Sequence, residues 1–199
     1  MKKLISTLGI ASIALFSMSF MAPIKPSNYK VDTQKSLVSW NGKKVAGEHS
    51  GTIKLSSGEL SLEGTKLAKG SFTMNMNSIN CTDLQGEWAD KLVGHLKADD
   101  FFGVEKYPTS TFVITKVSPA AVGTINVSGN LTIKGITKPL SFPASLSVKG
   151  NTVTASAKGV KVDRTKYDIR YGSKSFFDSI GDKAIDDEFT LDITLVASK

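Results

Sequence analysis

The chain is poor in the residues from which most catalytic and metal sites are built. Its 199 residues include one cysteine, Cys81, and two histidines, His49 and His95. A metal site needs several converging His, Cys or carboxylate ligands. No His-x-x-x-His or Cys-x-x-Cys spacing brings such ligands together here. We therefore expect a structural or surface role for each histidine and no metal site.

The single cysteine excludes an internal disulfide, so the stability of the fold must come from packing. We expect Cys81 to be a small buried hydrophobe rather than a reactive thiol or a link between two chains. The sequence also lacks a Gly-x-Ser-x-Gly elbow and a glycine-rich phosphate loop. Asp99 and Asp100 are adjacent, and capping of a helical turn explains them better than acid–base catalysis. We predict a protein that is not an enzyme and has no cofactor.

The positive charge is not gathered into a patch. The formal net charge is +7, and the lysines are spread along the chain. A dispersed positive surface usually serves solubility, so we expect no nucleic-acid partner. Transient contact with an anionic membrane surface or a membrane protein, and a homodimer, are compatible with this composition.

Only one apolar run approaches the length of a membrane span, and it lies at the start of the chain. Lys2 and Lys3 precede Leu4–Ala22, which is apolar apart from Ser and Thr. This order is typical of an export signal. We predict a signal peptide over residues 1–22, cleaved between 19 and 28, with an uncleaved anchor as the alternative. Residues 29–199 then form a single domain, most simply in the periplasm and otherwise outside the cell.

The chain is rich in period-two alternation of apolar and polar residues, which predicts strands with one apolar face. Turn pairs such as Ser57-Gly58, Lys69-Gly70 and Gly150-Asn151 favour an antiparallel meander. Such a sheet must close on itself or face a second sheet. The alternating apolar positions are Phe72, Met74, Met76, Ile125, Val127, Leu131, Ile133, Leu140, Phe142, Leu146, Val148, Phe189, Leu191, Ile193 and Leu195.

One segment departs from this rhythm and predicts a helix over Thr82–Val93. Leu84, Trp88, Leu92 and His95 recur at helical spacing, Thr82-x-x-Gln85 has the form of a capping box, and Gly94 follows as a stop. We expect a shorter helical turn over Lys97–Phe101 and an irregular stretch over Arg170–Ile185. Tyr107-Pro108 should return the chain to a strand.

Four segments in this order resemble the YceI family: Gly47–Thr52, His95–Phe112, Gly129–Pro139 and Val162–Gly172. The resemblance extends over almost all of residues 29–199. It implies an all-β fold, a closed antiparallel barrel of about eight strands that is lipocalin-like and extended, with one or two short helices at its rim. It also implies an exported binding protein that carries a long polyisoprenoid lipid, such as an isoprenoid quinone or polyprenyl lipid, inside the barrel. The charged Arg164–Asp187 insertion departs from the broader family pattern.

The alternation alone does not decide whether the barrel is filled or hollow, because a barrel of about eight strands can pack its own side chains or hold one small ligand. The resemblance favours the hollow barrel. Large and small residues are mixed on the inward face, Ala144, Ala155 and Ala157 being the small ones. We predict that the ligand is lined by Trp40, Phe72, Met74, Met76, Leu92, Phe112, Ile114, Val127, Leu131 and Phe142.

The mouth of the barrel is a further prediction. Arg164 and Tyr167 offer donors to a ligand headgroup, and a solvated, self-paired strand is the alternative for this segment. The sequence has two pairs of adjacent phenylalanines, Phe101 with Phe102 and Phe176 with Phe177. Because exposed loops seldom carry adjacent phenylalanines, we expect one member of each pair to plug the interior of the barrel. The two pairs, together with Trp88, would then close one end of the barrel.

Two other functions remain open at this point. One is a surface β-sandwich that binds carbohydrate or protein and has a filled interior. The other is an accessory that presents a quinone to a membrane redox protein.

Overall fold

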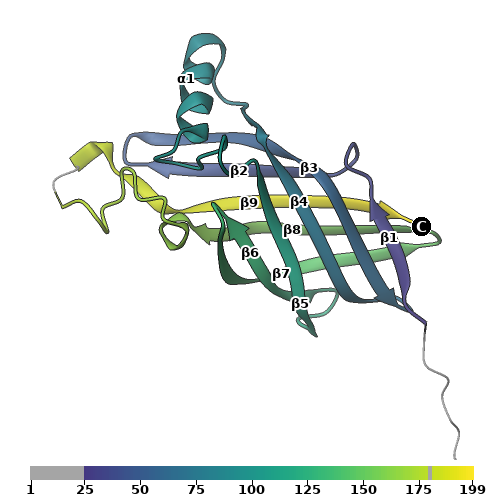
Figure 1. Cartoon of the computed structure of the whole chain (residues 1–199). Coiled ribbons are helices and arrows are strands. Elements are labelled where there is room, and N and C mark those ends of the chain that lie inside the picture. Colours follow the sequence, from purple (N-terminus) through teal and green to yellow (C-terminus); the bar gives the residue numbers. More distant parts are fainter. Residues whose placement is uncertain (1–24, 179–180) are drawn as a thin grey trace, which may run out of the picture.

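The computed structural model describes residues 25–178 and 181–199, so the predicted signal peptide over residues 1–22 lies outside the described residues. Within them the strands form one antiparallel barrel, and the helix α1 stands away from its wall (Figure 1). The elements in chain order are β1 Ser27–Val31, β2 Leu37–Lys44, β3 Gly47–Glu63, β4 Lys66–Cys81, α1 Gly86–Lys97, β5 Thr109–Pro119, β6 Ile125–Ile133, β7 Ile136–Lys149, β8 Thr152–Asp163, the 3-10 turns η1 Arg164–Tyr167 and η2 Gly181–Lys183, and β9 Ile185–Ser198.

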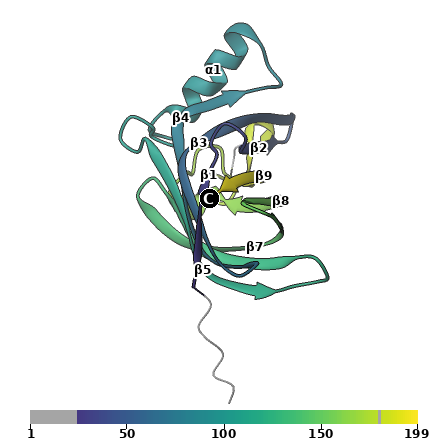
Figure 2. The ribbon, with the colours of Figure 1, turned by 90° about the vertical axis from the view of Figure 1, so that its right-hand side faces the viewer.

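The nine described strands occupy eight positions around the barrel, because β1 and β2 share one. Lys30 of β1 pairs with both β3 and β9, and Val38 of β2 pairs with the same two strands further along. The remaining strands follow in the order β9, β8, β7, β6, β5 and β4, and β4 pairs back with β3. Closure of the sheet is visible along the axis in Figure 2. The predicted all-β barrel of about eight antiparallel strands is therefore confirmed.

The predicted turns at Ser57-Gly58 and Lys69-Gly70 are wrong, because both glycines lie within strands. Gly58 lies inside β3 and Gly70 lies inside β4, and the chain turns between these strands at residues 64–65. A Cβ at Gly58 would lie 2.9 Å from a Val31 methyl group. Glycine within a strand often marks such a close approach. The third predicted turn, Gly150-Asn151, is confirmed between β7 and β8.

The helix exists, but its boundaries differ from the prediction. It begins at Gly86 rather than Thr82, and Gly94 lies within it rather than after it. The Thr82 hydroxyl donates to the Ser50 carbonyl instead of capping the helix, and the Gln85 side chain makes no capping hydrogen bond. The predicted separate turn over Lys97–Phe101 is instead the end of α1 followed by hydrogen-bonded turns.

One end of the barrel is filled by side chains. The short strand β1 contributes Tyr29 and Val31, which are buried in the same core as Leu62, Val153 and Ala197. The other end carries α1, the turn that follows it and the segment from η1 to η2 (Figure 1). Among the described helices, none is long and apolar enough to cross a bilayer.

Candidate functional site

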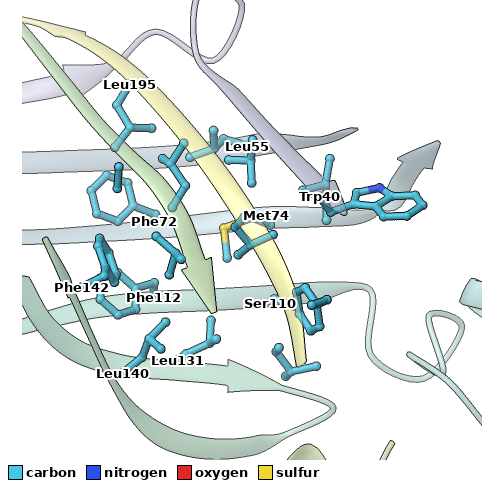
Figure 3. Close-up of a pocket in the computed structure, with 18 of the residues that line it drawn as sticks. Trp40, Leu55, Phe72, Met74, Ser110, Phe112, Leu131, Leu140, Phe142 and Leu195 are labelled. Carbon is cyan, nitrogen blue, oxygen red and sulfur yellow. The ribbon is translucent and has the colours of Figure 1, made fainter. Parts of the chain in front are cut away.

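The barrel encloses an apolar cavity of about 210 Å³ (Figure 3). A single water molecule needs only about 10–15 Å³ by a comparable measure, so the cavity is far larger than a packing defect. Most of the predicted lining residues border it: Trp40, Phe72, Met74, Met76, Phe101, Phe102, Phe112, Ile114, Val127, Leu131, Phe142 and Arg164.

The wall of the cavity offers hydrocarbon and very little else. Phe112 and Phe142 from neighbouring parts of the wall pack with ring centroids 5.5 Å apart. The Ser110 hydroxyl faces inward, but it lies 2.9 Å from the Met76 sulfur and is buried. Such a wall suits a ligand with a long apolar part, because polar groups placed there would lose their hydration without replacement.

Two glycines let aromatic rings lie flat against the wall. A Cβ at Gly51 would come within 2.6 Å of the Trp40 ring, whose Nε1 donates to the Asn80 carbonyl. A Cβ at Gly129 would come within 2.5 Å of the Phe112 ring. The glycines therefore leave room for these rings beside the cavity rather than across it.

The prediction that Trp88 and Leu92 reach the ligand differs from the structure. Trp88 is 71% exposed on α1 and pairs with Lys91 at the surface. Leu92 packs against the core but does not border the cavity. Trp88, Leu92 and Leu96 share one face of α1, because they are four residues apart. Only Leu96, in the last turn, is buried and borders the cavity, whereas Trp88, in the first turn, lies beyond its reach.

The two phenylalanine pairs also have different positions. Phe101 is 7% exposed, and both it and Phe102 border the cavity. Phe176 and Phe177 are 45% and 50% exposed and do not border it. The prediction that one member of each pair plugs the interior is therefore wrong for the second pair, which is half exposed and does not border the cavity.

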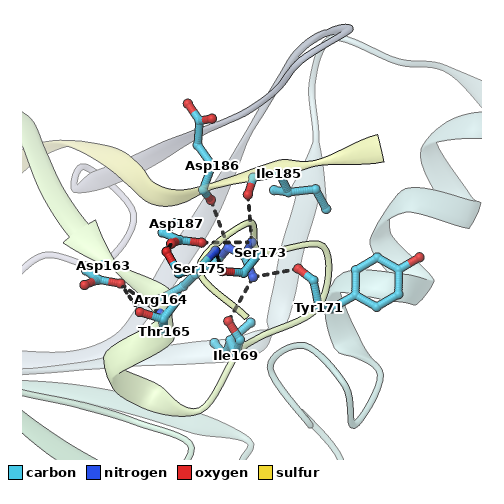
Figure 4. A network of polar contacts seen from close by, with 10 residues as sticks. All are labelled: Asp163, Arg164, Thr165, Ile169, Tyr171, Ser173, Ser175, Ile185, Asp186 and Asp187. Carbon is cyan, nitrogen blue, oxygen red and sulfur yellow. Dashed lines mark hydrogen bonds and ion pairs between the residues drawn. The ribbon is translucent and has the colours of Figure 1, made fainter. Parts of the chain in front are cut away.

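Arg164 borders the cavity but is not a free donor. It is 2% exposed, and its guanidinium donates four hydrogen bonds to backbone carbonyls (Figure 4). The acceptors are the carbonyls of Ile169 and Tyr171 at 2.8 Å, Asp186 at 2.9 Å and Ile185 at 3.0 Å. Burial lowers the pKa of Arg164, opposed by the nearby carboxylates of Asp187, Asp163 and Asp186. The side chain fastens the segment between β8 and β9, and this corrects its prediction as a headgroup ligand.

Tyr167 is buried in η1 and does not border the cavity. Burial, with a smaller contribution from the charge of Asp163, raises the pKa of Tyr167 to about 12. The segment is thus neither a solvated strand nor a row of free donors. Asp163 caps η1 by accepting from the Thr165 amide.

A second polar cluster fastens the base of α1 to β3. Asp83 accepts from the His49 ring at 2.8 Å and from the Ser50 amide at 2.7 Å. Desolvation would raise the pKa of Asp83, but the hydrogen bonds from Ser50, His49 and Cys81 lower it to about 2. Cys81 is half-buried with its thiol 3.2 Å from Asp83, so it is not the buried hydrophobe that we expected.

His95 lies in the last turn of α1, edge-on to Tyr171 and Phe101, with centroids 4.4 and 5.6 Å apart. It therefore ties the helix to the segment after η1. Among the described residues, no group of three or more His, Cys, Asp or Glu is placed to hold a metal.

Sequence reasoning missed part of the wall that β3 supplies. Ile53 and Leu55 border the cavity, yet the alternation stops at a bulge between Leu55 and Ser57. The alternation of Ile53 and Leu55 with polar residues could have predicted two inward positions of a strand, but the Ser-Ser-Gly run that follows is typical of a turn. Leu96 was missed because the predicted helix ended before it.

Known proteins resemble this chain in sequence and in fold. A UPF0312 protein of Vibrio cholerae is 31% identical over 147 residues, 72% of this chain and 74% of that protein. The solved structure of Burkholderia cenocepacia BcnA superposes with a TM-score of 0.69 at 26% identity, covering 84% of this chain and 99% of BcnA. A Saccharophagus degradans domain, described as polyisoprenoid-binding and implicated in plant cell wall breakdown, superposes with a TM-score of 0.65. Its identity is 16%, over 85% of this chain and 97% of that domain, so this likeness shows the fold alone.

The sequence model of the family described as YceI-like domain matches residues 29–197 of this chain. These residues extend from β1 almost to the end of β9. The match spans the barrel that encloses the cavity, and the chain therefore belongs to the YceI family.

Proposed function

We propose that the protein is an exported, non-enzymatic carrier or store that holds one isoprenoid lipid in its barrel. The observation that supports this most is the cavity, which is closed at the β1 end and bordered almost entirely by apolar side chains. A wall of this kind selects for hydrocarbon. The alternative of a surface β-sandwich module predicts a filled interior, whereas this barrel is hollow.

The energetics favour a long tail over a strong headgroup contact. Each buried CH₂ contributes about 0.8 kcal/mol, so a five-carbon isoprene unit contributes roughly 3–4 kcal/mol before the costs of ordering and association. A few units would give tight binding with no ionic contact. The affinity should therefore rise with the number of isoprene units that the cavity accommodates.

The choice of an isoprenoid, such as a quinone or a polyprenyl lipid, draws on the family and on the shape of the wall. The Saccharophagus degradans domain with the same fold is described as polyisoprenoid-binding. Branched and flexible side chains such as Leu131, Met74 and Ile193 can pack against the methyl branches of such a chain. The apolar segment after Lys2 and Lys3 has the pattern of an export signal and supports the proposal of export, with the periplasm as the proposed destination.

Filling the cavity provides the test. Ala155 borders the cavity, and its neighbour Thr154 is exposed on the outer face. Ala155→Phe should weaken binding of a polyprenol at least tenfold, measured by native mass spectrometry or by competition with a fluorescent fatty ligand. Thr154→Phe is the matched control and should bind like the unaltered protein. Equal binding by both variants, or no binding by the unaltered protein, would contradict the proposed function.

A further inference from the structure

The exposed aromatic residues gather at one end of the molecule. Among the residues that the structure describes, the exposed Trp, Tyr and Phe side chains are Trp88, Tyr171, Phe176 and Phe177. Trp88 lies on α1, and the other three lie on the segment after η1. Both elements occupy the same end of the barrel, beside the tip of the β2–β3 hairpin (Figure 1), where Val45 is also exposed. We call these five residues the α1-end cluster. Exposed apolar residues that gather in this way mark sites of interaction with a protein or a membrane.

Direct contacts tie together the three elements that carry the α1-end cluster. The Val45 amide at the hairpin tip donates to the Ala184 carbonyl at 3.1 Å. The ring of His95 in α1 lies edge-on to Tyr171, with the ring centroids 4.4 Å apart. The cluster is therefore one surface of the folded barrel rather than a set of independent loops.

The same three elements also border the cavity. α1 contributes Leu96, β2 contributes Gly42, and Ile185 borders the cavity where the segment after η1 joins β9. At the opposite end of the barrel, the buried side chains of Tyr29 and Leu62 belong to the core and do not border the cavity. The α1-end cluster therefore lies at the end toward which the cavity extends.

The surroundings of the cluster carry almost no net charge. Residues 43–48, 86–97 and 168–178 together contain six Lys and Arg and five Asp and Glu, although the formal net charge of the whole chain is +7. Three of these cations are paired with neighbouring acids: Lys43 with Glu48 at 3.8 Å, Lys91 with Glu87 at 3.5 Å and Arg170 with Asp168 at 2.9 Å. The excess of lysines lies elsewhere on the barrel, so this end does not select for an anionic partner.

A lipid bilayer fits these features better than a protein partner does. A stable protein interface buries a continuous, closely packed area of about 800 Å² on each partner. The cluster instead presents separate side chains on three elements, with charged pairs between them. The interfacial layer of a bilayer is fluid and accepts separate side chains, and Trp and Tyr are enriched there because each ring is apolar with one polar atom. An isoprenoid lipid is also dissolved in bilayers rather than in water.

We infer that the α1-end cluster docks the barrel on the surface of a phospholipid bilayer, with Trp88, Phe176 and Phe177 entering the interfacial layer. The inference rests on the proposed function for its purpose, since docking at this end brings the cavity to the membrane that holds the lipid. The contact depends on apolar side chains rather than on net charge, so a zwitterionic bilayer is sufficient.

Vesicles of phosphatidylcholine that contain no isoprenoid test docking on its own. We expect the protein purified from its own cell envelope to co-sediment with them, and the double variant Trp88→Ser, Phe177→Ser to bind at least about tenfold more weakly, because such binding scales with the apolar area that enters the membrane. The matched control is Leu37→Ser, Val122→Ser, which removes two exposed apolar side chains outside the cluster and should bind like the unaltered protein. Raising the NaCl concentration from about 0.05 M to about 0.5 M should change the binding less than about twofold, because salt screens only the contribution of charge.

Trp88 can report its own position. In the variant Trp40→Phe it is the only tryptophan of the chain. Its emission should move to shorter wavelengths when phosphatidylcholine vesicles are added, and iodide should quench it less. An emission that stays unchanged while the protein co-sediments with the vesicles would overturn the inference.

Binding of farnesol in the absence of vesicles separates the two proposals. Trp88 and Phe177 do not border the cavity, so Trp88→Ser, Phe177→Ser should bind farnesol like the unaltered protein. Farnesol binding without vesicle binding would overturn the docking and leave the proposed function standing, whereas cluster-dependent vesicle binding without farnesol binding would support the docking and contradict the proposed function.

Three other results would also overturn the docking. The first is equal vesicle binding by the cluster variant and the control variant. The second is binding that requires anionic lipid and disappears at high salt, which would assign the contact to the dispersed lysines. The third is self-association that depends on the cluster and takes the place of vesicle binding, which would make this surface an interface between two copies of the chain.

Discussion

The two phenylalanine pairs lie at the same end of the barrel, and each has its own arginine. Phe101 is buried, and the Arg164 guanidinium carbon lies 5.7 Å from its ring centroid. Phe176 is half exposed, and the Arg170 guanidinium carbon lies 4.7 Å from its ring. The two pairs differ in exposure because different contacts anchor the two chain segments that carry them. The turn after α1 is anchored by its own apolar side chains, whereas the segment after η1 is anchored by the hydrogen bonds of Arg164.

This contrast shows that an aromatic pair is not by itself a plug. Phe101 is held with Leu96 and Val104, which are buried on either side of it in the chain. In the segment after η1 the interior position is taken by Arg164, so Phe176 and Phe177 need not enter the barrel. The comparison predicts a different sensitivity to mutation at each arginine and at each phenylalanine.

The largest effect is expected at Arg164. Arg164→Met keeps a long apolar stem but leaves four buried or half-buried carbonyls without their donor. Removing one partner of such a network costs about 3–5 kcal/mol of unfolding free energy, which urea denaturation would measure. Arg170→Met is the control, because Arg170 is exposed and its contacts are with the exposed Asp168 carboxylate and the half-exposed Phe176 ring; it should cost less than about 1 kcal/mol. Equal losses at both sites would contradict the anchoring role of Arg164.

The next effect separates the phenylalanines. Phe101→Ala removes a buried ring and should cost about 3 kcal/mol, near the lower end for such changes because one side of the ring already faces the cavity. Phe176→Ala should cost less than about 1 kcal/mol, since half of the side chain is exposed. Thermal melts of the two variants would measure the difference. A larger loss for Phe176 than for Phe101 would mean that the second pair enters the barrel in solution.

The smallest effect concerns the attachment of α1 through Asp83. Its pKa is lowered from 3.8 to about 2 in the folded protein, so its contribution to stability is complete above about pH 4 and is lost as the pH falls toward 2. Solvent screening limits this contribution to about 1 kcal/mol or less. Asp83→Asn should be less stable than the unaltered protein at pH 7, and the two urea midpoints should converge at about pH 2. A constant difference between pH 7 and pH 2 would show that the charge of Asp83 is not what stabilises this attachment.

The inward face of the barrel could be predicted from the sequence because alternation carries over directly to a sheet. Phe72, Met74, Leu131 and Phe142 all border the cavity as the pattern indicates. The strand register inside β3 could not be predicted in the same way, because the bulge at Leu55 shifts the alternation. Periodicity reports the face of a strand and fails where an extra residue interrupts the pairing.

The rim of the barrel was harder to predict, for two physical reasons. The capping pattern at Thr82 also fits a hydroxyl that bonds across to another strand, as it does with Ser50. The roles of Arg164, Phe176 and Phe177 depend on which side chain occupies a shared space, and that competition is settled by tertiary contacts rather than by local sequence.

The most direct test of the account is native mass spectrometry of the protein purified from its own cell envelope, followed by organic extraction of whatever it carries. We expect one isoprenoid lipid for each chain, released by the solvent and identified by its mass. A ligand-free mass that stays unchanged after incubation with quinones and polyprenols would contradict the account, because the cavity would then not serve to bind such a lipid.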